Sequence, residues 1–485
     1  MTKLEPQSVF DCFAQVNQVP RPSKREEKMI EFLRQFGKGL GLETEVDETG
    51  NVVIRKAATP GYENRKTVIL QSHMDMVCEK NKDMDFDFEH DAIQTYVDGE
   101  WLKAKGTTLG ADDGIGVAME MALLLSNDIE HGPIECVFTR DEETGLTGAE
   151  GMQPGFMRGE YLINLDSEDE GEIFVSCAGG VRTEGRYSFP LAGRESVEGM
   201  FVANVVVKGL TGGHSGDDIN KKRANANKLM VRFLCEEMAK TDLRLVDIQA
   251  GGLHNAIPRE AHATVAVPMD FKEQLRIDLN IFAANVREEF SVTEPTMVID
   301  MESNMEDKRP ALQKDAARQM LKSLLAVHNG VFAMSQDLEG LVETSSNLAS
   351  IRLEGEEVRV NTSQRSSVPS NIPNMAHIVR SALELGSAAC VTNEGYPGWK
   401  MNPKSEIVRI ARESYVRLFG KEPKVKAIHA GLECGLFSEK YPNLDMVSFG
   451  PTLRGVHSPD EKLLIPTVKM VWDHLLDILR NIPEK

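Results

Sequence analysis

The sequence contains no hydrophobic run long enough to cross a membrane, which takes about 18–20 apolar residues. The longest apolar stretch, from Ile115 to Leu125, is interrupted by Glu120. The first residues, MTKLEPQSVFDCF, include no apolar segment of the kind that a secretory signal requires. We therefore expect a protein that is neither embedded in a membrane nor secreted.

The sequence also lacks paired-cysteine motifs and phosphate-binding motifs. The seven cysteines are scattered, their number is odd, and no C-x-x-C pair occurs. This pattern is typical of reduced thiols in a cytoplasmic protein and argues against a disulfide framework or a zinc ribbon. The glycine-rich segment from Gly110 to Gly116 does not fit G-x-G-x-x-G, and no G-x-x-x-x-G-K-[ST] occurs, so a nucleotide site has little support.

Positive charge is scarce in this chain. Lys and Arg number 55 against 75 Asp and Glu, which gives a formal net charge of −20. Nucleic acid and anionic membranes would repel such a chain, so neither is expected as a partner. The charge suits a soluble protein, or one that gathers cations. The length of 485 residues corresponds to about three folding units.

The arrangement of predicted elements indicates one α/β domain with an insertion. Near both ends of the chain, short apolar strands alternate with helical patterns, which predicts a mostly parallel sheet with helices on both faces. The middle block shows β-branched alternation, as in Phe201 to Lys208, and helical patterns, as in Asn220 to Lys240. We predict an α/β domain from residues 1–183 and 397–485. It is interrupted at residues 184–396 by an inserted domain that consists of two α+β structural subunits of the same chain.

Acidic and histidine side chains collect where predicted strands end. In open α/β sheets, ligands bind beyond the carboxyl ends of the strands, so we expect these side chains to converge. The members are His73 and Asp75 after VILQS, Glu142 and Glu143 after IECVFTR, Asp166 after YLINL, His457 after MVSFGPTLRG, and Asp112 in the GADDG turn before the Ile115 helix.

Crowded carboxylates raise one another's pKa, and bound cations relieve this conflict. Two divalent ions balance three carboxylates and one hydroxide, and imidazoles add neutral ligands. His73, Asp112, Glu143, Asp166 and His457 satisfy this balance for two ions that share one carboxylate. Nitrogen and oxygen ligands without thiolate favour Zn²⁺, Mn²⁺ or Co²⁺ over Ca²⁺ or Mg²⁺. Each segment alone also fits a solvated loop or a helix N-cap, so the combination carries the prediction.

These motifs resemble those of the co-catalytic dizinc metallopeptidases, a family that includes carboxypeptidases, aminoacylases and tripeptidases. The likeness extends over nearly the whole chain and is closest to the bacterial aminoacyl-histidine dipeptidases. It implies metal-dependent hydrolysis of dipeptides, including Xaa-His and carnosine-like β-alanyl-histidine. The segments that carry it are HMD, DEETG, LDS, GTTLGADDGIG, DSEDEGEIFVSCAGG, KGLTGGHSG, NAIPREA, GYPGW, IHAGLECGLF and GPTLRGVHSPDE.

The resemblance implies a role for each residue of the predicted metal site. Asp75 would orient His73, and Glu142 would act as the general base that serves a metal-activated water. The sequence alone does not decide which of Glu142 and Glu143 is the base and which is the ligand. The implied ligands are His73 and Asp166 for one zinc ion, Glu143 and His457 for the other, and Asp112 between the two.

The inserted block resembles a lid that supplies substrate contacts. His214 is the implied donor to the oxyanion, with a turn residue among glycines as the alternative, and Asn255 is expected to touch the substrate. Arg365 suits the dipeptide carboxylate because guanidinium binds carboxylate in a bidentate manner, although a solvated arginine is the alternative. In relatives the lid either forms a dimer contact or reaches over the active site. The resemblance therefore implies a homodimer.

Two other functions compete with this prediction. An aminoacylase, a deacetylase or a broader di- or tripeptidase of the same family would have the same metal site and different lid residues. A metal-dependent peptide-binding protein without turnover belongs to another class. Glu142 and Asp75 argue against it, because binding alone needs neither residue.

Overall fold

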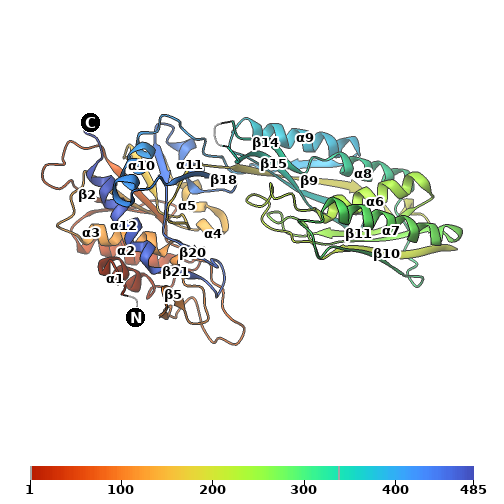
Figure 1. The fold of residues 1–485 in the computed structure, drawn as a ribbon, viewed down its shortest axis with the longest axis horizontal. Coiled ribbons are helices and arrows are strands. Elements are labelled where there is room, and N and C mark those ends of the chain that lie inside the picture. The colour runs from red at the N-terminus through yellow and green to blue at the C-terminus, as the bar shows by residue number, and fades with distance from the viewer. Residues whose placement is uncertain (1–2, 337–338) are drawn as a thin grey trace. The chain divides into compact units, whose positions relative to one another are not determined.

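The structure is a computed structural model that describes residues 3–336 and 339–485. The chain forms two compact units. In Figure 1, unit 1 contains the red to orange and the blue elements, and unit 2 contains the green and cyan ones. Among the described residues, no helix combines the length and the apolarity that crossing a bilayer requires. Unit 1 comprises the chain up to Ser176, Trp399–Ala427 and Leu432–Lys485; unit 2 comprises Cys177–Gly398 and Ile428–Gly431.

Unit 1 is built on an eight-stranded sheet in the order β1-β2-β6-β3-β7-β19-β8-β18. Strands β6, β3, β7 and β19 are parallel, whereas the β1–β2, β2–β6 and β19–β8 pairings are antiparallel. Every residue of β3, β6 and β7 is buried, as expected for parallel strands covered on both faces. The bounds are β1 Glu43–Val46, β2 Val52–Lys56, β3 Val68–His73, β6 Ile134–Thr139, β7 Tyr161–Asn164, β8 Glu172–Cys177, β18 Lys424–Ile428 and β19 Asp445–Ser448.

The helices of unit 1 cover this sheet. Helix α3 packs on β3 and against α1, while α10 packs on β19 and against α12. Residues of α3 are buried on all sides, which is typical of a helix inside a core. The bounds are α1 Gln7–Val16, α2 Glu27–Gly39, α3 Ala111–Leu125, α4 Glu142–Gly145, α5 Thr147–Gly151, α10 Glu406–Phe419, α11 Glu433–Lys440 and α12 Ile465–Arg480.

The predicted α/β fold class is confirmed, and parallel pairing is confined to the centre of the sheet. The edge strand β1 is partly exposed and pairs through a hairpin, which needs no crossover connection. A four-stranded sheet in the order β20-β21-β5-β4 was not predicted, because its strands are too short to show a periodic pattern. Its bounds are β4 Thr95–Asp98, β5 Trp101–Ala104, β20 Leu453–Arg454 and β21 Lys462–Leu464.

Unit 2 is an antiparallel nine-stranded sheet in the order β13-β10-β12-β11-β15-β16-β9-β17, with β14 paired to β15. Helices α7, α6, α8 and α9 each pack against the next and contact the sheet (Figure 1). The bounds are β9 Gly179–Ser188, β10 Met200–Lys208, α6 Ala226–Lys240, β11 Arg244–Gly251, β12 Ala261–Pro268, α7 Lys272–Glu289, β13 Val298–Ser303, α8 Lys314–Ala326, β14 Gly330–Met334, β15 Val342–Glu354, β16 Glu357–Ser366, α9 Asn371–Leu385 and β17 Ala389–Thr392.

The alternation predicted for β10 appears in the packing. Phe201, Ala203, Val205 and Val207 belong to the main core of unit 2, while Val202 packs in a smaller cluster. Neighbouring side chains of a strand point to opposite faces, so one strand serves both clusters.

The helix predicted from Asn220 begins later, and this part of the prediction is wrong. The Asn225 side chain accepts hydrogen bonds from the backbone N–H groups of Asn227 and Lys228. Such an N-cap satisfies backbone donors that have no partner in the first turn, and it fixes the start of α6 at Ala226.

Candidate functional site

The parallel strands of unit 1 bring the predicted metal ligands together. Strand β3 ends at His73, β7 is followed by Asp166, and β6 leads into α4 with Glu143. Because the strands are parallel, these ends lie along one edge of the sheet. The turn before α3 brings Asp112 to this edge, and the loop after β20 brings His457.

Asp112 lies at the centre of the group, with one carboxylate oxygen toward each histidine. Asp112 Oδ1 is 3.1 Å from His73 Nε2, and Asp112 Oδ2 is 3.1 Å from His457 Nε2. His73 Nε2 is also 3.5 Å from Asp166 Oδ1, and His457 Nε2 is 2.9 Å from Glu143 Oε2. The five side chains therefore form two groups that share Asp112.

The donor atoms of these groups are close enough to hold cations. Ligand atoms of His73, Asp112 and Asp166 lie within 4.8 Å of one another, as do those of Asp112, Glu143 and His457. Glu143 Oε1 is buried and, within the described residues, has no hydrogen-bond partner. A buried carboxylate oxygen without a donor is costly, and a cation would satisfy it. The donor set fits two divalent ions that share one carboxylate.

The electrostatics of the group favour added positive charge. Burial raises the pKa of Asp166 to about 7 and the pKa of Glu142 well above its ordinary value. Hydrogen bonds to Asp112 and Glu143 raise the pKa of His457 to about 11. Burial also raises the pKa of Asp112, but hydrogen bonds from the two histidines outweigh it and leave this pKa below its usual range. The site binds protons tightly, and a divalent cation competes for the same oxygens.

Asp75 connects His73 to the acidic turn. Its Oδ1 is 3.4 Å from His73 Nδ1 and accepts a hydrogen bond from the Glu142 backbone N–H at 3.1 Å. Its Oδ2 accepts from the Glu143 backbone N–H at 3.3 Å and from Ser23 Oγ at 2.8 Å. One buried carboxylate therefore contacts the ring of His73 and holds the two backbone groups that carry Glu142 and Glu143.

Sequence reasoning missed two buried glutamates near this group. Glu433 Oε2 accepts hydrogen bonds from Gln71 Nε2 at 2.6 Å and Thr139 Oγ1 at 2.8 Å, and burial raises the pKa of Glu433 to about 8. Glu461 accepts hydrogen bonds from the backbone of the turn that carries Asp112. Neither glutamate directly follows a predicted strand, so the pattern that identified the ligands gave no signal for them.

The substrate residues predicted from the sequence all lie in unit 2. His214 pairs with Ala256 in an isolated bridge, and the Ser215 backbone N–H donates to the Asn255 carbonyl at 2.8 Å. Arg365, near the end of β16, is only 8% exposed, so the alternative of a solvated arginine is wrong. Asn255 itself is exposed.

The hydrogen bonds of His214 occupy Nδ1 and leave Nε2 as the donor of the ring. Its Nδ1 accepts from the backbone N–H groups of Gly216 at 3.3 Å and Asp217 at 3.2 Å. These donors favour the ring with its proton on Nε2. The Asp217 carboxylate lies 3.2 Å from the same Nδ1. In the tautomer that the two backbone donors favour, Nε2 carries the ring hydrogen.

Arg365 has neighbours that the sequence did not predict. Its Nη1 donates to Tyr396 Oη at 2.9 Å. His429 Nε2 lies 2.7 Å from Ser345 Oγ, and burial, then the charge of Arg365, lower the pKa of His429 to about 3. Burial, followed by the charges of Arg182 and Arg365, also lowers the pKa of His254. Unit 2 therefore holds neutral histidines around a buried cation.

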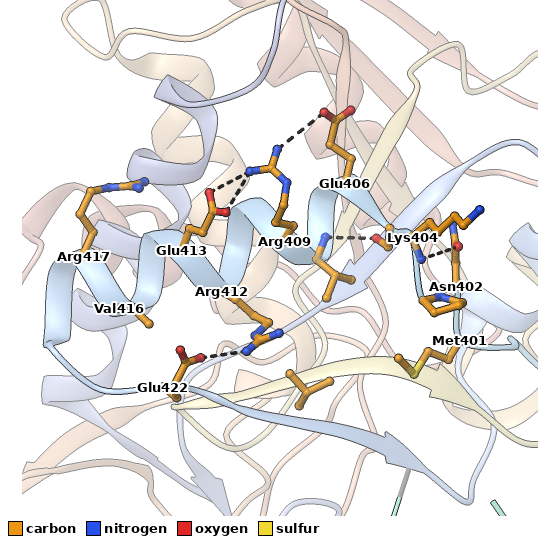
Figure 2. A pocket seen from close by; sticks show the side chains of 14 residues that line it. Met401, Asn402, Lys404, Glu406, Arg409, Arg412, Glu413, Val416, Arg417 and Glu422 are labelled. Atoms are coloured by element: carbon orange, nitrogen blue, oxygen red, sulfur yellow. Dashed lines mark hydrogen bonds and ion pairs between the residues drawn. The ribbon is translucent and has the colours of Figure 1, made fainter. Parts of the chain in front are cut away.

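A separate pocket of about 920 Å³ lies along α10 in unit 1 (Figure 2). Most of its charged side chains pair with one another, whereas Arg417 pairs with Asp477 outside the lining. Arg409 is 2.9 Å from Glu413, and Arg412 is 3.1 Å from Glu422. None of the predicted site residues lines this pocket. Because its charges largely compensate one another, the pocket offers no concentrated charge to a ligand.

Comparisons with known proteins identify the family of this chain. The profile of Peptidase family M20/M25/M40 matches residues 69–481. The cytosol non-specific dipeptidase of Escherichia coli K12 is 42% identical over 486 residues, which cover 100% of this chain and 99% of that protein. The aminoacylhistidine dipeptidase of Vibrio alginolyticus has a crystal structure that matches with 44% identity and a TM-score of 0.92, over 100% of this chain and 98% of that one. A tripeptidase from Staphylococcus aureus shares the fold, with a TM-score of 0.58, 15% identity and 99% of each chain covered.

Proposed function

Since the chain belongs to peptidase family M20/M25/M40 and is a hydrolase that acts on peptide bonds, we propose that it is a metal-dependent dipeptidase that accepts Xaa-His substrates, including β-alanyl-histidine. The observation that carries this proposal is the Asp112 carboxylate between His73 and His457, each of which also faces a second carboxylate. The printed names of the Escherichia coli and Vibrio alginolyticus relatives support a dipeptide substrate.

The proposed site holds two divalent ions, with zinc as the first candidate and cobalt or manganese as alternatives. When bound, two such ions lower the pKa of water to about 7 and polarise a scissile carbonyl. His73 and Asp166 would hold one ion, His457 and Glu143 would hold the other, and Asp112 would contribute to both. This assignment follows the close contacts of Asp112 with the two histidines and of each histidine with a second carboxylate.

We assign the general base to Glu142. Its pKa is raised well above the ordinary value, chiefly by burial, which makes it a stronger base than a free carboxylate. Asp75 holds the backbone of Glu142 and thereby directs its side chain. Glu142 takes a proton from the attacking water and delivers it to the nitrogen of the leaving amine. Glu143, the next residue, already faces His457 and is the ligand of the two.

Unit 2 acts in this proposal as a lid that supplies substrate contacts. His214 Nε2 carries the ring hydrogen, because Nδ1 accepts from two backbone N–H groups, and it donates to the oxyanion of the reacting carbonyl. Arg365 pairs with the dipeptide carboxylate, with Tyr396 holding its guanidinium. Asn255, exposed beside His214, contacts the substrate.

The name of the Escherichia coli relative supports a cytosolic location, which we propose for this protein as well. The expected homodimer stays a prediction, and sedimentation of the purified protein tests it directly.

The decisive experiment is a hydrolysis panel. It contains β-alanyl-histidine, other Xaa-His dipeptides, dipeptides without histidine, a tripeptide and N-acetyl amino acids. Each substrate is assayed as isolated, after chelation, and after return of Zn²⁺, Mn²⁺ or Co²⁺. We expect chelator-sensitive cleavage of dipeptides, with Xaa-His among the best.

Other results of this panel would redirect the proposal. Cleavage of N-acetyl compounds alone would leave the metal site in place and make the protein an aminoacylase. Equal cleavage of dipeptides and tripeptides would replace the Xaa-His preference with a broad peptidase. Two bound metal ions per chain without any cleavage would contradict catalysis and favour a peptide-binding protein.

A further inference from the structure

Glu461 is a buried carboxylate that accepts four backbone hydrogen bonds from one turn. Its Oε2 accepts from the N–H groups of Leu109 at 2.8 Å and Gly110 at 3.0 Å. Its Oε1 accepts from Ala111 at 2.8 Å and Asp112 at 3.3 Å. The side chain is 2% exposed, so these bonds are shielded from water. A single carboxylate thus holds the whole backbone segment that ends at Asp112.

The same turn is held by a buried arginine. Arg21 Nη2 donates to the Gly110 carbonyl at 2.6 Å, and Arg21 is 1% exposed. A Cβ atom at position 110 would lie 2.5 Å from that nitrogen, so the close approach requires glycine. Gly110 also has a left-handed backbone with φ of 66°. Glycine adds little stiffness of its own, so external contacts determine the shape of this turn.

Glu461 also belongs to the loop that carries His457. The Glu461 backbone N–H donates to the Ser458 carbonyl at 3.0 Å, and Ser458 Oγ donates to the Gly455 carbonyl at 2.7 Å. These bonds close the loop into a compact turn. The carboxylate of Glu461 therefore ties the His457 loop to the Asp112 turn, and the two turns present side chains that meet at 3.1 Å.

We propose that Glu461 is a positioning residue that sets the separation between the Asp112 carboxylate and the His457 imidazole, and thereby the affinity for the divalent ion that they share. This inference rests on the proposed metal site. It assigns Glu461 no contact with substrate or metal. The other ion shares Asp112, but its remaining ligands, His73 and Asp166, lie at the ends of β3 and β7, which the Glu461 carboxylate does not contact, so it should depend less on Glu461.

The test is Glu461→Gln in the full-length protein. An amide keeps the size of the side chain, but its oxygen replaces only one of the two acceptors, and its NH₂ group faces two N–H donors. The matched control is Glu294→Gln in unit 2. Glu294 is 3% exposed and also accepts backbone hydrogen bonds, from Thr211 at 2.6 Å and Ala224 at 2.9 Å.

The measurement is a Co²⁺ titration of metal-free protein, followed by visible absorption and by the number of ions bound per chain. We expect wild type and Glu294→Gln to bind two Co²⁺. Glu461→Gln should bind the Co²⁺ at His457 about 10–100-fold more weakly, the usual cost of removing a residue that supports a ligand, and should lose less affinity for the other Co²⁺. In parallel assays kcat should recover at high Co²⁺ while KM stays unchanged. A purely structural role would not produce this rescue.

Two results would overturn the inference in distinguishable ways. Wild-type Co²⁺ affinity at both sites of Glu461→Gln would overturn the inference and leave the proposed function standing. A wild-type protein that binds no Co²⁺ and cleaves no peptide would overturn both. If Glu461→Gln does not fold, Glu461→Asp takes its place, because it keeps the charge with a shorter reach. Unchanged binding of the ion at His457 in that variant would also contradict the inference.

Discussion

The two units assemble polar clusters of opposite character. The cluster of unit 1 gathers carboxylates, and burial raises the pKa of Asp166 and Glu142. The cluster of unit 2 gathers histidines around Arg365, and burial lowers the pKa of His254 and His429. In both units burial disfavours the charged form of ionisable side chains. The charge that remains is negative in unit 1, on carboxylates, and positive in unit 2, on Arg365. The first suits a cation and the second suits a carboxylate.

The clusters also differ in how they are held. In unit 1 the side chains come from the ends of parallel strands and from turns whose backbone groups bind Asp75 and Glu461. In unit 2 the Arg365 guanidinium is held by a side chain, Tyr396, although His214 accepts from two backbone N–H groups. Backbone clamps fix a position more tightly than side-chain contacts, since fewer rotatable bonds separate the groups. This rigidity suits the cation site that we propose for unit 1.

The largest expected effect separates chemistry from metal binding within unit 1. Glu142→Gln should lower kcat about 10²–10⁴-fold, the usual contribution of a general base, while two metal ions remain bound. Metal analysis and initial rates on the same preparation measure both quantities. Glu150→Gln, an exposed residue on α5, serves as the control and should behave as wild type. A rate for Glu142→Gln equal to wild type would remove Glu142 from the mechanism.

The next effect should appear in unit 2 alone. Arg365→Ala should raise KM for dipeptides about 10–100-fold, because a charge-assisted hydrogen bond contributes about 1.5–3 kcal/mol. Metal content should not change. Arg352→Ala, an exposed arginine on the neighbouring strand β15, is the control.

A dipeptide amide sharpens this test of Arg365. It lacks the carboxylate, so wild type and Arg365→Ala should cleave it with similar KM. A large difference between the two proteins on the amide would show that Arg365 acts on something other than the substrate carboxylate.

The smallest effect concerns His474 in unit 1, which burial keeps neutral. It corresponds to His429 in unit 2, which burial and the charge of Arg365 keep neutral. His474 Nε2 donates to the Ala411 carbonyl at 2.8 Å, and burial lowers the pKa of His474 to about 4. In the unfolded chain the pKa of this histidine returns to its ordinary value of 6.5. Between pH 4 and pH 6.5 the unfolded chain therefore binds more protons than the folded protein. Stability is therefore lost as the pH falls, by about 1 kcal/mol from pH 7 to pH 5.5.

His474→Gln keeps a hydrogen-bond donor but takes up no proton. Urea unfolding at pH 7 and pH 5.5 should therefore show a loss about 1 kcal/mol smaller for His474→Gln than for wild type. His90→Gln, at an exposed position, should follow wild type. Equal losses in all three proteins would contradict the role assigned to burial.

Local patterns were enough to predict the frame of unit 1 and its five candidate ligands. Apolar runs of strand length predicted β3, β6 and β7, because strands buried on both faces have few polar residues. Acids directly after those runs predicted convergence, because parallel strands end at one edge. The β-branched alternation in β10 contributed to the prediction of an α+β domain, because the side chains of a strand point alternately to its two faces.

The chain by itself thus determined which residues carry charge at strand ends, and the tertiary structure decided what surrounds them. The partners of Glu461 are backbone N–H groups, which every residue type except proline possesses, so no sequence pattern marks them. Arg365 meets Tyr396 across 31 positions and Ser345 meets His429 across 84. Such contacts depend on how strands and loops fold back on one another, and local propensity carries no information about that.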